Sequence, residues 1–171
     1  MSNIYYSREL YHHGVKGMKW GVRKKEPTKT WKTKTKTGAE ITVTKNRRGI
    51  IGNTVQKLTN QDFDVYQARN AQGKKVGTIQ LDRKSKDEMN IVWMDTKRKH
   101  QGRGYASALL ATGERIAKEA GARKLTAEVV GDSPDMQHIV DKRGYVKKGE
   151  IKTQEILEMW GGLTLVELDL K

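Results

Sequence analysis

A glycine-broken loop at residues 100–105, His-Gln-Gly-Arg-Gly-Tyr, restricts the fold of this chain more than any other stretch of its sequence. Residues 89–94 before it are β-prone and largely apolar, which predicts a buried strand. After it, small and apolar residues recur every three or four positions from Ala106 to Ala120, which predicts an amphipathic helix. A strand that leads through glycines into a helix presents free backbone N–H groups and the positive end of the helix dipole, and this arrangement commonly binds phosphate. The loop therefore predicts a phosphate-binding site.

Alternating segments before the loop predict antiparallel strands. Residues 62–69 and 75–82 alternate between apolar and polar side chains around the turn sequence Asn-Ala-Gln-Gly, which predicts a hairpin. Residues 84–88 form the next turn and lead into the strand before the loop. Residues 28–37 and 40–44 also alternate, and Gly38 permits a turn between them, so we expect another hairpin there, with an unstructured Lys-rich linker as the alternative. Residues 55–58 are expected to form one helical turn.

The segments after the loop predict a parallel strand pair and a second helix. Gly121 is suited to end the first helix, and residues 124–130 form a strand, so the order strand, helix, strand implies a parallel pair with a helical crossover. Asp132, Ser133 and Pro134 form a helix start, and the helix is expected to run to about Arg143. Residues 145–148 and 163–170 are predicted strands, and residues 154–160 are helical or extended. The fold class is therefore α/β, with a mixed, mostly antiparallel sheet flanked by helices.

The charge is concentrated near the N-terminus. Residues 1–38 hold ten of the 34 Lys and Arg residues but only two of the 20 Asp and Glu residues, which places +8 of the net +14 there. A charge of +14 favours nucleic acid, anionic surfaces or anionic small ligands, and it disfavours a cationic amine substrate relative to a neutral amine or an acidic protein. The chain has no cysteine, which excludes disulfides and thiolate chemistry. It has no apolar run of 18 residues and no apolar signal core, so we expect a protein of the cytoplasm with no membrane partner.

Residues 11–24 predict a docking segment within a basic extension that we place at residues 1–38, ahead of a folded domain at 39–171. Three glycines and the lack of periodicity argue against independent folding of the segment, yet it carries Val15, Met18 and Trp20, which are suited to bind in a partner's pocket. The alternative is a disordered basic leader. The run His-Gly-Val-Lys-Gly-Met-Lys-Trp-Gly-Val-Arg resembles a short segment of tailed-bacteriophage and prophage proteins. This resemblance implies a phage-encoded protein that contacts a phage structural protein or a host protein, with virion association as an alternative location.

The loop and the element order around it resemble the GNAT superfamily of acetyl-CoA-dependent N-acetyltransferases over residues 62–171. The family signature at the strand-to-helix junction is matched by Gln101, Gly104 and Ala106. The resemblance implies that acetyl-CoA is the co-substrate and that the loop N–H groups hold its pyrophosphate. The residues that it places at the coenzyme are Met94, Thr96, Gln101, Gly102, Arg103, Gly104, Tyr105, Ala106, Ser107 and Ser133. It also places Arg98 or Lys99 within reach of the coenzyme phosphates.

Two departures from the family pattern bear on catalysis. The position where the family often has a Tyr that protonates the departing thiolate is Val140, which has no proton to donate. Water or Tyr145 are the remaining candidates for that role. The family also has a pair of helices near the start of the domain, whereas residues 46–60 provide for one short helix at most, so we expect that helix pair to be reduced.

A general base is needed to take a proton from the acceptor amine. The candidates are Glu128 on the strand after the first helix, Asp95 at the end of the preceding strand, and His138 on the second helix. The pair His12 and His13 lacks further ligands at regular spacing, so we expect no metal site.

Three functions compete at this point. The first is a GNAT acetyltransferase that transfers acetyl to an amine of a small molecule or a protein, for which the intact loop argues. The second is a catalytically weak or inactive GNAT-fold binding or virion-associated protein, for which Val140 and the reduced helix pair argue. The third is nucleic-acid binding through the basic extension, with Tyr11, Trp20 and Trp31 available for base stacking.

Overall fold

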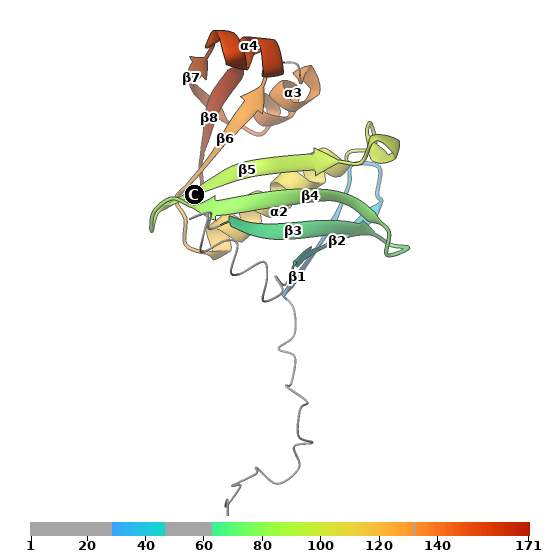
Figure 1. Cartoon of the computed structure of the whole chain (residues 1–171). Helices are drawn as coiled ribbons and strands as arrows, with labels where there is room; N and C mark the ends of the chain where they lie inside the picture. The colour runs from blue at the N-terminus through green and yellow to red at the C-terminus, as the bar shows by residue number, and fades with distance from the viewer. Residues whose placement is uncertain (1–28, 47–62, 132) are drawn as a thin grey trace, which may run out of the picture.

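One eight-stranded sheet runs through the computed structural model, which describes residues 29–46, 63–131 and 133–171 (Figure 1). The strand order is β1-β2-β3-β4-β5-β6-β8-β7, and β5 with β6 is a parallel pair while the other six pairs are antiparallel. The strands are β1 (Thr30–Lys34), β2 (Glu40–Lys45), β3 (Phe63–Asn70), β4 (Lys75–Arg83), β5 (Glu88–Thr96), β6 (Lys124–Val130), β7 (Val146–Ile151) and β8 (Leu163–Asp169). The helices are η1 (Arg98–His100), α2 (Tyr105–Glu119), α3 (Pro134–Lys142) and α4 (Gln154–Trp160). This confirms the predicted mixed, mostly antiparallel α/β fold.

The predicted elements are found with small shifts at their ends. Both predicted hairpins form, as β1–β2 and β3–β4, and the undecided segment at 154–160 is helical because Thr153 accepts a hydrogen bond from the N–H of Ile156 and caps it. The expected boundary at residue 38 lies inside the β1–β2 hairpin, so the sheet begins before residue 39. The expected turn at 55–58 and the reduced helix pair fall outside the described residues. None of the described helices is long and apolar enough to cross a membrane.

Helix α2 covers one face of strands β1 to β5 and forms the centre of the core with them (Figure 1). Its residues Leu109, Leu110 and Ile116 are at most 4% exposed. Gly113 allows the helix to approach β4 closely, since a Cβ atom at this position would lie 2.6 Å from Cδ1 of Ile79. Because paired residues on neighbouring strands point to the same face, Met94 lies with Ile79 on the α2 side of the sheet.

Strands β5 and β6 are paired along only part of their length. The pairs run from Glu88 with Lys124 to Ile91 with Ala127, and no pair follows. The next residue of β5, Val92, is an extra residue in the β4–β5 ladder, because Trp93 pairs with Gln80 and Ile91 with Leu81. Such a bulge bends its strand and increases the local twist. Beyond it the two strands diverge and leave a gap between their C-terminal halves (Figure 1).

Strand β1 is fastened to the rest of the domain by Trp31. Its ring is 5% exposed, packs edge-on against Tyr66 at a centroid distance of 5.6 Å, and donates from Nε1 to a carboxylate oxygen of Glu119 at 3.0 Å. Lys29 pairs with the same carboxylate at 2.8 Å. The basic and aromatic hydrogen-bond donors around Glu119 lower its pKa to about 2. The first strand is thereby connected to the C-terminal end of α2.

We predict that Trp31→Ala lowers the free energy of unfolding by about 3–5 kcal/mol, the range for truncating a buried aromatic side chain. Urea unfolding followed by circular dichroism measures this. The exposed neighbour Lys32 provides the matched control, because Lys32→Ala is expected to stay within about 0.5 kcal/mol of the wild type. Equal effects of the two substitutions would show that β1 is not part of the cooperative fold.

Candidate functional site

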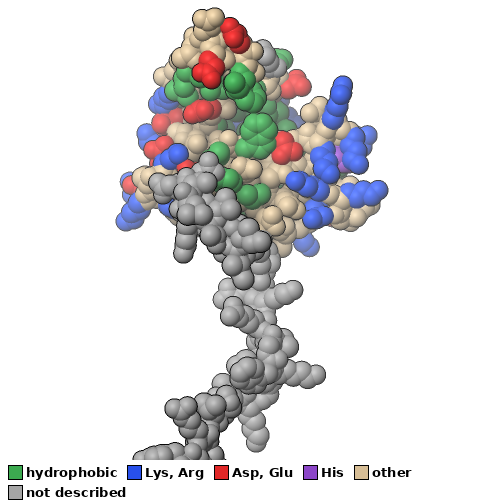
Figure 2. Space-filling model, viewed as in Figure 1, with side chains coloured by type: hydrophobic (Ala, Val, Ile, Leu, Met, Phe, Trp, Pro, Cys, Tyr) green, Lys and Arg blue, Asp and Glu red, His purple; other side chains and the backbone are tan. Residues whose placement is uncertain are grey.

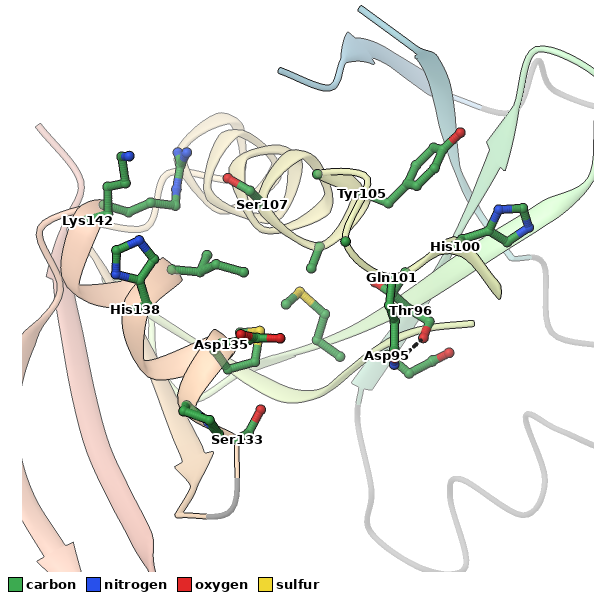
Figure 3. A pocket seen from close by; sticks show the side chains of 18 of the residues that line it. Asp95, Thr96, His100, Gln101, Tyr105, Ser107, Ser133, Asp135, His138 and Lys142 are labelled. Atoms are coloured by element: carbon green, nitrogen blue, oxygen red, sulfur yellow. Dashed lines mark hydrogen bonds between the residues drawn. The ribbon is translucent and has the colours of Figure 1, made fainter. Parts of the chain in front are cut away.

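A groove of about 980 Å³ lies between the N-terminal end of α2, the end of β5 and helix α3 (Figure 3). Three chain segments meet in it: the end of β5 with the glycine loop and first turn of α2, helix α3, and the β1–β2 turn. The lining residues are Lys36, Met94, Asp95, Thr96, His100, Gln101, Gly102, Gly104, Tyr105, Ala106, Ser107, Ser133, Pro134, Asp135, Met136, His138, Ile139, Lys142 and Arg143.

The first turn of α2 presents free backbone N–H groups to this groove. The helix begins after Gly104, whose φ of 77° is left-handed, and the first helical hydrogen bond runs from the N–H of Ala108 to the carbonyl of Gly104. The N–H groups of Tyr105, Ala106 and Ser107 therefore lack helical acceptors. The N-cap glycine has no side chain to satisfy them, and the first turn carries no acidic residue. This end of the dipole is uncompensated and suited to bind an anion.

The end of β5 supplies further free backbone groups. Successive residues of a strand direct their N–H and C=O groups to opposite edges. The N–H of Lys97 donates to the carbonyl of Val76 on β4, so the backbone groups of Met94 and Thr96 point to the opposite edge, into the gap beside β6. The carbonyl of Thr96 accepts from Nε2 of Gln101 at 3.3 Å, and the N–H of Met94 has no strand partner on that edge within the β5–β6 ladder.

Helix α3 forms the opposite wall. The positions that line the groove recur at helical spacing, as Asp135, His138 and Lys142 show, whereas Val140 is 0% exposed and belongs to the core. The N-cap residue Ser133 makes no side-chain cap hydrogen bond. The Arg143 guanidinium forms a two-point ion pair with the Glu114 carboxylate of α2, which fastens the two walls together.

Most of the predicted coenzyme residues are brought together in the groove. The groove is lined by Met94, Thr96, Gln101, Gly102, Gly104, Ala106, Ser107 and Ser133, and Tyr105 also contributes to the lining although its side chain is directed away from the groove (Figure 3). Arg103 is exposed and does not line it, nor do Arg98 and Lys99. The partner-binding residues predicted at Val15, Met18 and Trp20 lie outside the described residues.

The three candidate bases lie on two sides of the sheet. His138 lines the groove from α3, on the same side of the sheet as the first turn of α2 (Figure 3). Asp95 pairs with Thr78 and its side chain points to the face away from α2, although it also contributes to the groove lining. Glu128 comes directly after the last β6 residue paired with β5, is exposed on that same far face, and does not line the groove. Asp95 and Glu128 therefore lie on the two sides of the strand gap.

Tyr145 is not placed to donate a proton in the groove. Its side chain is 6% exposed and does not line the groove. Burial, followed by the negative charge of Glu114, raises the pKa of its phenol far above the ordinary value, which makes it a weaker acid. Val140 and Tyr145 thus both point into the core. Of the two predicted proton donors to the departing thiolate, Tyr145 and water, only water remains.

The sequence did not reveal two lysines that approach each other in the groove. Lys36 comes from the β1–β2 turn and Lys142 from the last turn of α3. The pKa of Lys36 is lowered, first by hydrogen bonding with the Lys142 side chain and then by its positive charge. The turn itself packs against the phosphate loop, since a Cβ at Gly104 would lie 3.5 Å from Cβ of Thr35. The periodicity of the sequence cannot predict the contact between Thr35 and Gly104, because the two residues are almost 70 positions apart.

His100 is a second residue that the sequence did not single out. It is 8% exposed, packs edge-on against Tyr105 at 5.6 Å, and neither ring nitrogen has a hydrogen-bond partner among the described residues. Burial, followed by the positive charges of Lys99 and Arg103, lowers the pKa of its imidazole. The ring is therefore neutral at pH 7. In the described ranges, no three His, Asp or Glu side chains are grouped so that they could hold a metal ion.

Comparisons with known proteins agree with this geometry. Residues 44–145, more than half of the chain, match the acetyltransferase (GNAT) family, and residues 3–27 match a family of unknown function, DUF7211. No curated protein sequence matches.

Solved structures show the same fold at low sequence identity. The GNAT domain of S. lividans PAT is 21% identical, with a TM-score of 0.62 over 82% of this chain and 97% of that one. A GNAT family acetyltransferase from Elizabethkingia anophelis with acetyl-CoA bound is 16% identical, with a TM-score of 0.63 over 76% and 98%. The spermidine/spermine N-acetyltransferase SpeG from Vibrio cholerae is 14% identical, with a TM-score of 0.62 over 76% and 92%.

The buried His100 predicts a pH dependence of stability. Because its folded pKa lies below the unfolded value of about 6.5, the unfolded chain binds more protons in the interval between the two, and stability is lost as the pH falls through it. We expect His100→Phe, which keeps a ring against Tyr105, to flatten the decline in unfolding free energy between pH 7.5 and 5.5. His138→Phe, which replaces an exposed imidazole, is the matched control. If His100→Phe kept the pH dependence of the wild type, His100 would not be the residue that causes it.

Proposed function

This chain belongs to the acetyltransferase (GNAT) family, and from that premise we propose that it transfers an acetyl group from acetyl-CoA to an amine, by direct attack of the amine on the thioester. One observation carries the proposal: the groove runs from the free N–H groups at the start of α2 to the end of β5, where Met94, Asp95 and Thr96 line it. We infer that the first end of this groove holds the phosphates of the co-substrate and the second end holds its thioester. GNAT acetyltransferases use acetyl-CoA, and a structural neighbour contains it.

The residues of the groove fit this co-substrate. The N–H groups of Tyr105, Ala106 and Ser107 are suited to hold the pyrophosphate. Thr96, which lines the groove, contributes a buried hydroxyl that has no hydrogen-bond partner in the part of the chain that the structure describes. The acetyl-CoA supplies an activated acyl group with a thiol leaving group. The N–H of Met94, which points into the strand gap, is placed to donate to the thioester oxygen and to stabilise the charge that develops there.

The acceptor amine would approach from the other face of the sheet. Trp93 is 48% exposed there, and Asp95 and Glu128 are on the same face at the two sides of the gap. Figure 2 shows hydrophobic side chains gathered over the middle of this face, acidic side chains among them, and Lys and Arg mostly toward its edges. The local acidic groups oppose the repulsion that a net charge of +14 would impose on an ammonium substrate. We therefore propose a primary amine as the acceptor, and Asp95 or Glu128 as the group that takes its proton.

For the N-terminal extension we propose a docking role that is separate from the chemistry. The match of residues 3–27 to a family of their own, apart from the match at 44–145, supports a unit that occurs independently of the acetyltransferase domain. On the phage interpretation, Val15, Met18 and Trp20 would anchor the enzyme to a phage structural protein or a host protein, in the bacterial cytoplasm or on the virion.

Ala106, the second residue of α2, allows the coenzyme site to be tested apart from stability. In Ala106→Asp the new carboxylate compensates the helix dipole, which favours the fold by about 0.3–1 kcal/mol, but it also repels the coenzyme phosphates. Without ligand, we expect the melting temperature of this variant to be unchanged or higher. In the wild type, acetyl-CoA at a hundredfold excess over Kd should stabilise the fold by about 2.7 kcal/mol and raise the melting temperature, and we expect the variant to lose this increase.

The uncharged Ala106→Asn has nearly the same size and serves as the control for that variant. It is expected to retain most of the ligand-induced shift. An undiminished shift in Ala106→Asp would contradict a phosphate site at this turn.

Amide substitutions identify the general base. Asp95→Asn and Glu128→Gln keep the shape of each side chain and remove its basicity, so the one that takes the amine proton should lose about 10²- to 10⁴-fold in kcat/KM. Thiol release from acetyl-CoA with a panel of primary amines measures turnover, and the thermal shift with acetyl-CoA should persist in both variants. Full activity of both variants would exclude both residues, and absence of thiol release with every amine, despite acetyl-CoA binding, would favour a binding protein of this fold.

A further inference from the structure

Two lysines face the same part of the groove from different ends of the chain. Lys36 and Lys142 both line it, and their ammonium groups are close enough for each to affect the other. Among the described residues, neither forms an ion pair with an acidic side chain. Two ammonium groups that converge without a carboxylate between them repel each other, and an anion held between them would remove that repulsion.

The backbone of this region leaves the lysines free for a ligand. The β1–β2 turn is rigidly built, since Thr35 is 6% exposed and its hydroxyl accepts from the N–H of Ala39 at 3.0 Å. The turn contacts the phosphate loop at Gly104, which fixes the base of the Lys36 side chain beside the start of α2. Lys142 is positioned by the neighbouring ion pair of Arg143 with Glu114. Both lysines are exposed.

The position of the pair along the groove selects the anion. Acetyl-CoA is linear, with the thioester, the pantetheine, the pyrophosphate and the 3′-phosphorylated adenosine in that order. Helix α3 begins at Pro134 beside the strand gap, because it follows the end of β6, and Lys142 lies eight residues further on, about 12 Å along the helix axis. The free N–H groups of α2 are suited to bind the pyrophosphate. The two lysines lie at the end of the groove remote from the strand gap, where the 3′-phosphate of the coenzyme would lie.

We propose that Lys36 and Lys142 together bind the 3′-phosphate of coenzyme A, and that this protein therefore distinguishes acetyl-CoA from its dephospho form. The inference rests on the proposed function, since it concerns the same co-substrate. It also gives the β1–β2 hairpin a role in recognition, in addition to its place in the sheet.

The test compares the affinities of acetyl-CoA and acetyl-dephospho-CoA, which differ only in the 3′-phosphate, by calorimetry on the full chain. The wild type should bind acetyl-CoA at least about tenfold more tightly, as expected for hydrogen bonds between charged groups. Lys36→Met and Lys142→Met should each remove most of this difference by weakening acetyl-CoA alone. Lys36→Arg and Lys142→Arg, which keep the charge, should retain it, and so should Lys32→Met, which removes a charge from β1 outside the groove.

The outcomes separate this inference from the function that it rests on. Equal affinity of the wild type for the two ligands overturns the 3′-phosphate assignment and leaves the acetyltransferase proposal standing. Equal weakening of both ligands in the lysine variants also overturns it, because the lysines would then act on the pyrophosphate or through the general field. If neither ligand binds, and adenosine 3′,5′-bisphosphate does not bind either, the assignment and the proposed function fail together.

Discussion

The site depends on a hydrogen-bond ladder that stops early. Strands β5 and β6 pair from Glu88 to Ile91 and then part, at the point where Val92 adds a residue to β5. In a fully paired sheet the N–H of Met94 would donate a hydrogen bond to β6, whereas here it is directed into the gap between the two strands. Unpaired backbone groups inside a protein are costly, and a ligand that accepts from them recovers part of that cost. In the proposed function the coenzyme lies on the α2 side of the sheet at this point, and the acceptor approaches from the other face.

The two faces differ in their charge. On the α2 side the groove has lysines, free N–H groups and a helix N-terminus. It also has an acidic lining residue, Asp135 of α3, near the strand gap. On the far side Asp95 and Glu128 lie near the exposed ring of Trp93. The net charge of +14 does not convey this division, because ten of the basic residues belong to the first 38 positions. A summed charge describes the protein at long range, and the site is governed by the few groups that face it.

The sequence predicted the elements and the loop well because these follow from local rules. Alternation identified β3 and β4, and glycines at 102, 104 and 121 marked positions that the structure shows with φ of +73° to +83°. Contacts between distant segments were not predictable in this way. Lys36 enters the groove only because the sheet places β1 beside α2. Tyr145 was a predicted candidate for proton donation, and the structure places it in the core together with Val140. Arg103 shows the converse, since a basic residue inside the motif points to solvent.

The contact between the β1–β2 turn and Gly104 has a consequence for how the molecule assembles. The hairpin is made early by the ribosome and can form locally, but the surface on which it packs belongs to α2, whose residues follow about 70 positions later. Contacts between segments so far apart in the sequence form later than local hairpins and helices, because the entropy cost of closing the loop comes before the contacts stabilise it. The groove is therefore among the last parts of the domain to be completed. Coenzyme binding would then indicate that β1 has packed against the rest of the domain. The secondary structure content alone does not indicate this, because the hairpin can form before it packs.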